Sequence, residues 1–412
     1  MRIMMLCDLY DPFVGGLERN VQTLSRELVA RGHEVSVVTL WREGCPSQET
    51  DAYGVRVFRI GGWSRALERA FSDPNHHFHP PAPDPGTMRE LASLVRRLSP
   101  DIVNTHSWIL YSYLPLAHRF PARVVHTVHD YGFVCAKQNY LHRGTPCSGP
   151  AYLKCVRCSA DQYHPAVAAA VTTGLAASSR LHSRIDSVVA ISSAVAEASA
   201  VRARHPSRSV EVIPSFVPDG IVNEGLADSR PSFLPSEDGF LLFVGAVGTH
   251  KGVDVLLEAH RLMQTDVPLV LVGPHRAGAY PSLPDGVTLH AQASHPEVMA
   301  SWRRASVGIV PSIWPEPFGQ VAVEAMSVGT PVVASDIGGL RDIVAHDVTG
   351  LLVAPADPVA LADAVRRLLA DPAERVRLGA AGADHARQFM ISAVVGRVEE
   401  LFARVMNGIR AG

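Results

Sequence analysis

The segment SVGIVPSIWPEPFGQVAVEAMSVGTPVVASD (306–336) decides the fold of this 412-residue chain. It begins with a short apolar run that is typical of a buried strand, and it continues through a proline-rich loop into a stretch with helical spacing after Gly319. A second apolar run, TPVVAS (330–335), follows directly. A strand, a helix and a strand in this order predict a parallel sheet that is covered by helices.

The same rhythm recurs on both sides of this segment. Further short apolar runs lie at 2–7, 34–40, 101–106, 123–129, 187–192, 240–245 and 268–273. Residues 214–239, which are rich in Pro, Ser, Gly and Asp, interrupt the rhythm as an interdomain linker would. We therefore predict an α/β fold with two doubly wound, Rossmann-like domains that face each other across a cleft. The predicted divisions are an N-terminal domain at 1–214, a linker at 215–238, a C-terminal domain at 239–385 and a helical tail at 386–412, for which packing on the N-terminal domain is one option.

The composition excludes several classes of protein. With 38 Lys and Arg against 40 Asp and Glu, the formal net charge is −2, so the chain is not a globally basic nucleic-acid binder. No stretch reaches the roughly 18 to 20 apolar residues of a membrane helix. The apolar run at the N-terminus is too short for a secretory signal. We predict a cytoplasmic protein, and peripheral membrane contact stays open although no strongly basic amphipathic segment supports it.

Two glutamates in the deciding segment are candidate ligand-binding groups. Glu316 lies in the proline-rich loop, and Glu324 lies one to two turns inside the helix, among Val, Ala and Met. A buried carboxylate needs hydrogen-bond donors, and the vicinal hydroxyls of a ribose would supply them. The N–H groups at the start of the helix favour phosphate. A surface glutamate and a capping glutamate are the alternative interpretation, which the surrounding strand, loop and glycine make less favourable.

These motifs resemble glycosyltransferase family 4, whose members are retaining enzymes with the two-domain GT-B fold. The segment 312–344 resembles the donor-binding signature of the family, and Glu316 and Glu324 form its pair of glutamates spaced by eight. Four further motifs follow the family order along the chain: GGLERN (15–20), VHD (128–130), FVGAVGTHKGVD (243–254) and DVTGLLVAPAD (347–357). The resemblance implies that the N-terminal domain serves the acceptor and that the C-terminal domain binds a nucleotide-sugar donor.

The resemblance also implies a role for each matching residue. Glu316 would hold hydroxyls of the transferred sugar, Glu324 the ribose and Lys251 the diphosphate. His129 would lie beside the donor sugar near the reacting carbon. The remaining donor-binding positions are the loop of Gly15 and Gly16 and the backbone N–H groups of Phe318, Gly319 and Gln320.

Lys251 is the predicted substitute for a catalytic metal. Many transferases hold a metal with Asp-x-Asp, but no such sequence occurs here, and Lys251 is one of only three lysines. A fixed cation lowers the barrier by stabilising the charge that develops on the leaving diphosphate. The sequence departs from the family at Ala246, where an arginine is usual, and at Ser215, where an asparagine is usual. Lys251 would therefore carry more of the diphosphate charge.

Four cysteines cluster in an insertion at 135–158 of the N-terminal domain. Cys135, Cys147, Cys155 and Cys158 have the spacing C-x11-C-x7-C-x2-C. Disulfides are rare in a reducing cytoplasm, and four thiolates satisfy tetrahedral zinc. We predict a structural zinc ion here, with free thiols, a redox pair or an iron–sulfur cluster as alternatives.

The sequence therefore predicts a retaining, metal-independent glycosyltransferase of the hexosyltransferase type. The favoured donor is a UDP-sugar, with a GDP-sugar as the alternative, and the acceptor is a hydroxyl of a saccharide, a lipid-linked molecule or a natural product. An epimerase or hydrolase of the same fold and a non-catalytic binding protein for sugar nucleotides are the competing hypotheses.

Overall fold

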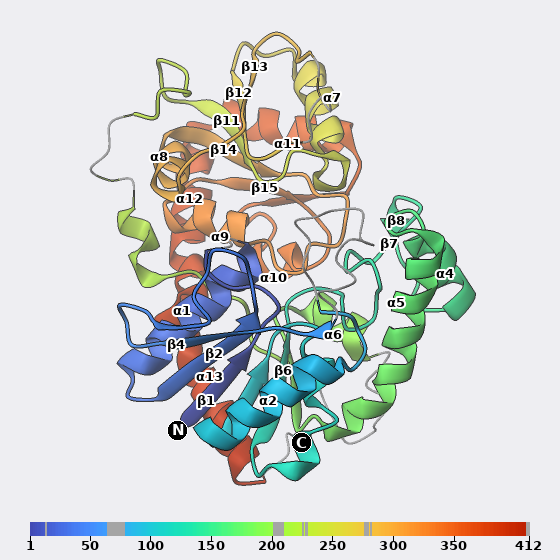
Figure 1. Ribbon diagram of the computed structural model, residues 1–412. Helices are drawn as coiled ribbons and strands as arrows, with labels where there is room; N and C mark the ends of the chain where they lie inside the picture. The colour runs from blue at the N-terminus through green and yellow to red at the C-terminus, as the bar shows by residue number, and fades with distance from the viewer. Residues whose placement is uncertain are drawn as a thin grey trace. The chain divides into compact units, whose positions relative to one another are not determined.

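The computed structural model describes residues 1–12, 15–63, 79–200, 210–224, 226, 230–275, 280 and 282–408. The chain divides into two compact units, whose helices and strands are labelled in Figure 1. Met1–Ser215 and Val394–Gly412 form the first unit, and Phe216–Ala393 form the second.

An eight-stranded sheet forms the centre of the first unit, in the order β10-β9-β6-β5-β1-β2-β4-β3. Its strands are β1 (Arg2–Leu6), β2 (Glu34–Leu40), β3 (Gln48–Thr50), β4 (Arg56–Ile60), β5 (Ile102–Thr105), β6 (Arg123–Val128), β9 (Ser187–Ala190) and β10 (Val210–Val212). All neighbouring strands are parallel except β3 and β4. The central strands β1 and β5 are buried along almost their whole length, as expected for a sheet with helices on both faces.

The first unit also contains helices. They are α1 (Gly16–Ala30), α2 (Pro85–Leu98), α3 (Leu110–Tyr113), α4 (Tyr152–Ser159), α5 (Pro165–Ser178), α6 (Ser193–Ala200) and α13 (Ile391–Met406). In α1, Val21, Leu24 and Leu28 recur at helical spacing and are all buried. From Val394 onward, α13 belongs to the first unit, where the Arg404 guanidinium nitrogen Nη2 lies 2.6 Å from the Glu211 Oε2. None of the helices within the described ranges is both long and apolar enough to span a bilayer.

The second unit repeats the arrangement with a fully parallel sheet in the order β13-β12-β11-β14-β15-β16. Its strands are β11 (Phe240–Val244), β12 (Leu269–Val272), β13 (Val287–His290), β14 (Ala305–Val310), β15 (Val332–Ser335) and β16 (Leu351–Val353). Its helices are α7 (Val253–Met263), α8 (His295–Arg304), α9 (Gln320–Ser327), α10 (Leu340–Ile343), α11 (Pro358–Ala370) and α12 (Pro372–Ala386). The predicted α/β class with parallel sheets is confirmed.

The topology gathers the predicted functional residues at strand ends. Within each sheet the carboxyl ends of parallel strands lie at one edge, where α/β proteins bind ligands. His129 directly follows β6 in the first unit. In the second unit, Lys251 follows β11 and Glu316 follows β14, which is the neighbour of β11. Lys251 and Glu316 should therefore meet.

Candidate active site

Lys251 and Glu316 form an ion pair in the second unit. The Lys251 Nζ lies 2.6 Å from the Glu316 Oε1, and the Ser312 hydroxyl donates to the same oxygen at 2.6 Å. The ammonium also lies 5.0 Å from the centre of the Trp314 ring, within the range of a cation–π contact. Glu316 is buried, and the Lys251 ammonium and the Ser312 hydroxyl hold its carboxylate.

The pair changes the ionisation of Glu316. Burial alone would raise the pKa of this carboxyl, but Lys251 and Ser312 offset the burial, and the pKa lies below its ordinary value. Glu316 is therefore an anion at neutral pH, able to accept hydrogen bonds from sugar hydroxyls. The ammonium balances that charge and can interact with a phosphate oxygen.

Close backbone packing fixes the loops that carry these two side chains. Gly252, directly after Lys251, has a φ of 73°, and a Cβ there would lie 1.8 Å from the Pro311 carbonyl oxygen. Gly338 has a φ of 59°, and a Cβ there would lie 2.4 Å from the Glu316 carbonyl oxygen. Only glycine fits at both positions, so the turn after β11 and the loop after β14 are held against their neighbours.

Glu324 lies on α9 in a second, separate contact. His295, the first residue of α8, has Nε2 3.3 Å from the Glu324 Oε1 and Nδ1 2.5 Å from the Glu224 Oε2. Hydrogen bonding to Glu324, aided by Glu224, raises the pKa of His295 against the opposing effect of burial. The imidazolium thus holds the Glu324 carboxylate in place. Sequence reasoning missed His295, because no local motif links it to a glutamate 29 residues away.

The other predicted donor residues surround the start of α9. Gly319 is the N-cap, with a φ of 109°, and Gln320 is the first helical residue. The Gln320 amide donates to the Phe216 carbonyl at 3.3 Å. Phe318 is buried and its ring packs edge-on against Phe389, so only its backbone N–H is suited to the predicted role.

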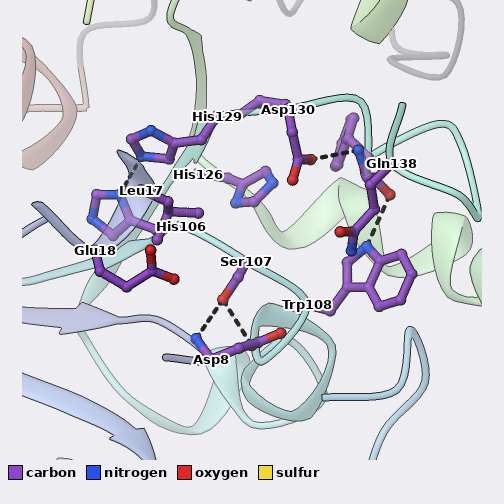
Figure 2. A pocket seen from close by; sticks show the side chains of 13 residues that line it. Asp8, Leu17, Glu18, His106, Ser107, Trp108, His126, His129, Asp130 and Gln138 are labelled. Carbon is purple, nitrogen blue, oxygen red and sulfur yellow. Dashed lines mark hydrogen bonds between the residues drawn. The ribbon is translucent and has the colours of Figure 1, made fainter. Parts of the chain in front are cut away.

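A pocket lies in the first unit, beyond β1, β5 and β6 (Figure 2). It is lined by Asp8, Leu17, Glu18, His106, Ser107, Trp108, His126, Val128, His129, Asp130, Gly132, Phe133 and Gln138. The structure therefore places His129 in a pocket of its own unit. Gly15 is the N-cap of α1 and Gly16 its first residue, which puts this loop two residues before the pocket residue Glu18.

His129 is hydrogen-bonded to a second histidine. Figure 2 shows the two rings turned toward each other, with His106 Nδ1 2.8 Å from His129 Nε2. Burial lowers the pKa of His129 to about 3 and the pKa of His106 well below its ordinary value. Both rings are neutral at pH 7, so one proton lies between these two nitrogens and fixes the tautomers of both rings. Sequence reasoning did not select His106, although its place after β5, the neighbour of β6, was a usable signal.

Three carboxylates line the same pocket. Asp8, two residues after the end of β1, accepts from the Ser107 hydroxyl at 2.7 Å and from the Ile109 N–H at 2.8 Å. Asp130 accepts from the Gly132 N–H at 2.6 Å. Burial raises the pKa of Asp8 to about 7, that of Asp130 to about 6, and that of Glu18 above its ordinary value.

The predicted zinc site finds no support in the structure. Within the described residues, which include all four cysteines, no group of three or more His, Cys, Asp or Glu side chains could hold a metal ion. The Cys147 and Cys158 thiols face the carbonyls of Gly149 and Leu141, each at 3.5 Å. Burial raises the pKa of Cys135 and Cys158, which disfavours the thiolates that zinc requires. The hairpin of β7 (Leu141–His142) and β8 (Thr145–Pro146) and the helix α4 lie within this cysteine-containing segment.

Family models match both halves of the chain. Residues 14–219 match the model described as Glycosyltransferase Family 4, and residues 227–385 match Glycosyl transferases group 1. A glycogen synthase from Mycobacterium tuberculosis is 29% identical and aligns over 92% of this chain and 88% of its own. A D-inositol 3-phosphate glycosyltransferase from Thermobispora bispora is 36% identical over 43% of this chain and 45% of its own.

Solved structures agree on the fold. Sucrose-phosphate synthase from Thermosynechococcus elongatus has a TM-score of 0.74 at 24% identity, over 99% of both chains. Anabaena Alr3699/HepE in complex with UDP has a TM-score of 0.68 at 18% identity, over 98% of this chain and 100% of its own. The two Rossmann-like units therefore form a GT-B fold. Together with the family models, the ion pair after β11 and β14 and the buried glutamate of α9 assign this chain to glycosyltransferase family 4.

Proposed function

We propose that the protein is a retaining glycosyltransferase that moves a hexosyl group from a UDP-sugar to an acceptor hydroxyl. The anomeric carbon loses its bond to the diphosphate and gains a bond to the acceptor oxygen, and the acceptor proton leaves with the nucleoside diphosphate. Family membership supports retention of the anomeric configuration. A GDP-sugar is the alternative donor.

The Lys251–Glu316 ion pair carries this proposal. Negative charge develops on the diphosphate as its bond to the sugar breaks, and Lys251 supplies a fixed cation at the carboxyl edge of the second sheet. Glu316 supplies an acceptor for sugar hydroxyls, and Glu324 supplies one for the ribose. His129 of the first unit would approach the transferred sugar, with its tautomer set by His106.

We further propose that donor cleavage needs no divalent metal. The chain contains no Asp-x-Asp sequence, and Lys251 with the N-terminus of α9 offers positive potential for the diphosphate. Transfer should therefore persist in EDTA. Rapid loss of transfer that Mg²⁺ restores would contradict this part of the proposal.

A ligand screen tests the donor and the reaction. The full chain is titrated with UDP, GDP, UDP-sugars and GDP-sugars while its melting temperature is recorded, since a ligand that binds the native state raises it. The best donor is then incubated with and without acceptors, and the anomeric configuration of the product is read by NMR. Conversion of the donor to an isomer or to free sugar alone would favour an epimerase or hydrolase, and binding without turnover would favour a binding protein.

A further inference from the structure

The pocket of Figure 2 contains more negative charge than its own residues balance. Among the described residues that line it, Asp8, Glu18 and Asp130 are acidic and none is a lysine or an arginine. Asp8 is satisfied within the protein by Ser107 and Ile109. Asp130 accepts from one backbone N–H, and the Glu18 carboxylate is supported by backbone N–H groups of its own turn. Neither of these two has a cationic partner among the residues that line the pocket.

A second feature of the pocket points to a ligand. His106 is 3% exposed, and its Nε2 has no hydrogen-bond partner in the described part of the chain. A buried polar atom without a partner destabilises the protein, so a ligand hydroxyl that bonds it would bind favourably. The cavity has a volume of about 40 Å³. One water needs roughly 10 to 15 Å³, so the space admits the functional groups at one end of a ligand.

Gly132 keeps the Asp130 carboxylate at the pocket. A Cβ at Gly132 would lie 2.8 Å from an Asp130 carboxylate oxygen and 3.2 Å from the Trp108 indole nitrogen. The indole N–H donates to the Gly132 carbonyl at 2.9 Å and fixes this turn. The position of the Asp130 charge is therefore determined by the fold of the loop after β6.

We propose that this pocket binds the acceptor, and that the acceptor carries an ammonium group beside its hydroxyl groups, as an amino sugar or an aminocyclitol does. The identification of the ligand as the acceptor rests on the proposed glycosyltransferase function. The ammonium pairs with Asp130 and Glu18, and a neighbouring hydroxyl bonds His106 Nε2. A phosphate or carboxylate on the acceptor would face three carboxylates and would be repelled.

Calorimetry with matched sugars tests the ligand class on the full chain, with and without UDP. The probes are glucosamine, glucose, N-acetylglucosamine and glucose 6-phosphate, which differ in charge at one substituent. A charge-assisted contact should make glucosamine bind about tenfold or more tightly than glucose or N-acetylglucosamine, with glucose 6-phosphate the weakest. Equal binding of glucosamine and glucose, or tightest binding of the phosphate, would overturn the proposal.

Variants locate the preference in this pocket. Asp130→Asn and Glu18→Gln should each reduce the ratio of glucosamine to glucose affinity toward one. Glu27→Gln is the matched control, because Glu27 lies on the same helix α1 and pairs with Arg31 instead. Melting temperatures identify a variant that fails to fold. The affinity ratio of the other variant then tests whether the amine binds in this pocket. A preference that both folded variants retain would place the amine elsewhere and overturn the assignment.

The titrations separate this inference from the proposed function. They measure binding of the amine and need no transfer, so they decide the ligand class even if no donor is consumed. If the protein consumes a donor but does not prefer the amine, the inference about the acceptor is wrong and the proposed function stands. Failure to bind or consume any UDP- or GDP-sugar removes the proposed function, whatever the amine result.

Discussion

Two carboxylates that follow parallel strands, one in each unit, have pKa values shifted in opposite directions. Glu316 follows β14 in the second unit and Asp130 follows β6 in the first, so each lies at the carboxyl edge of a parallel sheet. Lys251 and Ser312 bring the pKa of Glu316 below its ordinary value. Asp130, with one backbone donor and no cation, has a pKa raised to about 6. Both carboxylates follow a strand of a parallel sheet, and their neighbouring side chains decide the direction of the pKa shift.

The different surroundings of Glu316 and Asp130 suit the two units to ligands of different charge. A carboxylate with its own cation is stably ionised, and that cation can also interact with a diphosphate. A carboxylate without a neighbouring cation can form an ion pair with a cationic group of a ligand. On the proposed function, the second unit would bind the anionic donor and the first unit a ligand that is not anionic.

Removing the cation should have the largest effect. Lys251→Ala leaves Glu316 buried without its partner and removes the charge that stabilises the leaving diphosphate. We expect a loss of about a hundredfold or more in kcat/KM, together with a lower melting temperature. Steady-state kinetics and thermal unfolding measure the two effects.

Three further variants sharpen this result. Lys251→Arg should restore only part of the activity, because a planar guanidinium does not replace a compact ammonium. Lys154→Ala, a lysine of the first unit outside both sites, is the control. Ala246 is exposed, so Ala246→Arg has room to tighten nucleotide binding. Near-normal turnover in Lys251→Ala would mean that another group holds the diphosphate.

The two glutamates of the second unit should separate binding from transfer. Glu324→Ala should weaken UDP binding by about tenfold or more, because ribose contacts exist before the reaction. Glu316→Gln should mainly lower kcat, since it keeps the shape of the side chain and loses the charge beside Lys251. Calorimetry with UDP and single-turnover kinetics distinguish these effects. Unchanged UDP affinity in Glu324→Ala would show that the ribose assignment is wrong.

The central strands could be predicted from the sequence, but several edge strands could not. The central strands are apolar runs buried on both faces, as in RIMML of β1. The prediction omitted β3, β4, β10, β13 and β16, which lie at or near the sheet edges. β10 and β16 are only three residues long, and only the first side chain of β13 is fully buried. Such segments form strands because a neighbour offers hydrogen bonds, which local hydrophobicity does not encode.

The candidate site shows the same limit. Lys251 and Glu316 were predictable because each follows a strand, and adjacent parallel strands bring their ends together. The contact between His295 and Glu324 depends on the packing of α8 beside α9, for which the sequence has no local signal. The zinc prediction finds no support, because thiol spacing along the chain does not determine thiol direction, and the Cys147 and Cys158 thiols point to carbonyls.

Breaking the histidine pair should have a smaller effect than removing a glutamate. His106→Phe removes the nitrogen that bonds His129 Nε2, so His129 loses its fixed tautomer and position. We expect kcat to fall about tenfold while UDP affinity stays constant, because His106 belongs to the first unit and the proposed nucleotide-binding glutamate belongs to the second. The exposed His118, changed to Phe, is the control. If UDP affinity falls as strongly as kcat, the effect is on folding and not on His129.

The smallest expected effect concerns the imidazolium between Glu224 and Glu324. The pKa of His295 is raised in the folded protein, so its pairing stabilises the fold fully below the ordinary pKa of about 6.5 and less as the pH rises through the folded value. His295→Gln should therefore lower the melting temperature by a few degrees at pH 6 and by less at pH 9. His346→Gln is the matched control, because His346 is an exposed histidine of the same unit that lies 3.3 Å from Asp347. Glu324 would also lose its fixed position, so UDP affinity should weaken slightly at pH 6. A larger stability loss at pH 9 than at pH 6 would mean that His295 is neutral in the folded protein, and the cation that balances Glu324 would have to be sought elsewhere.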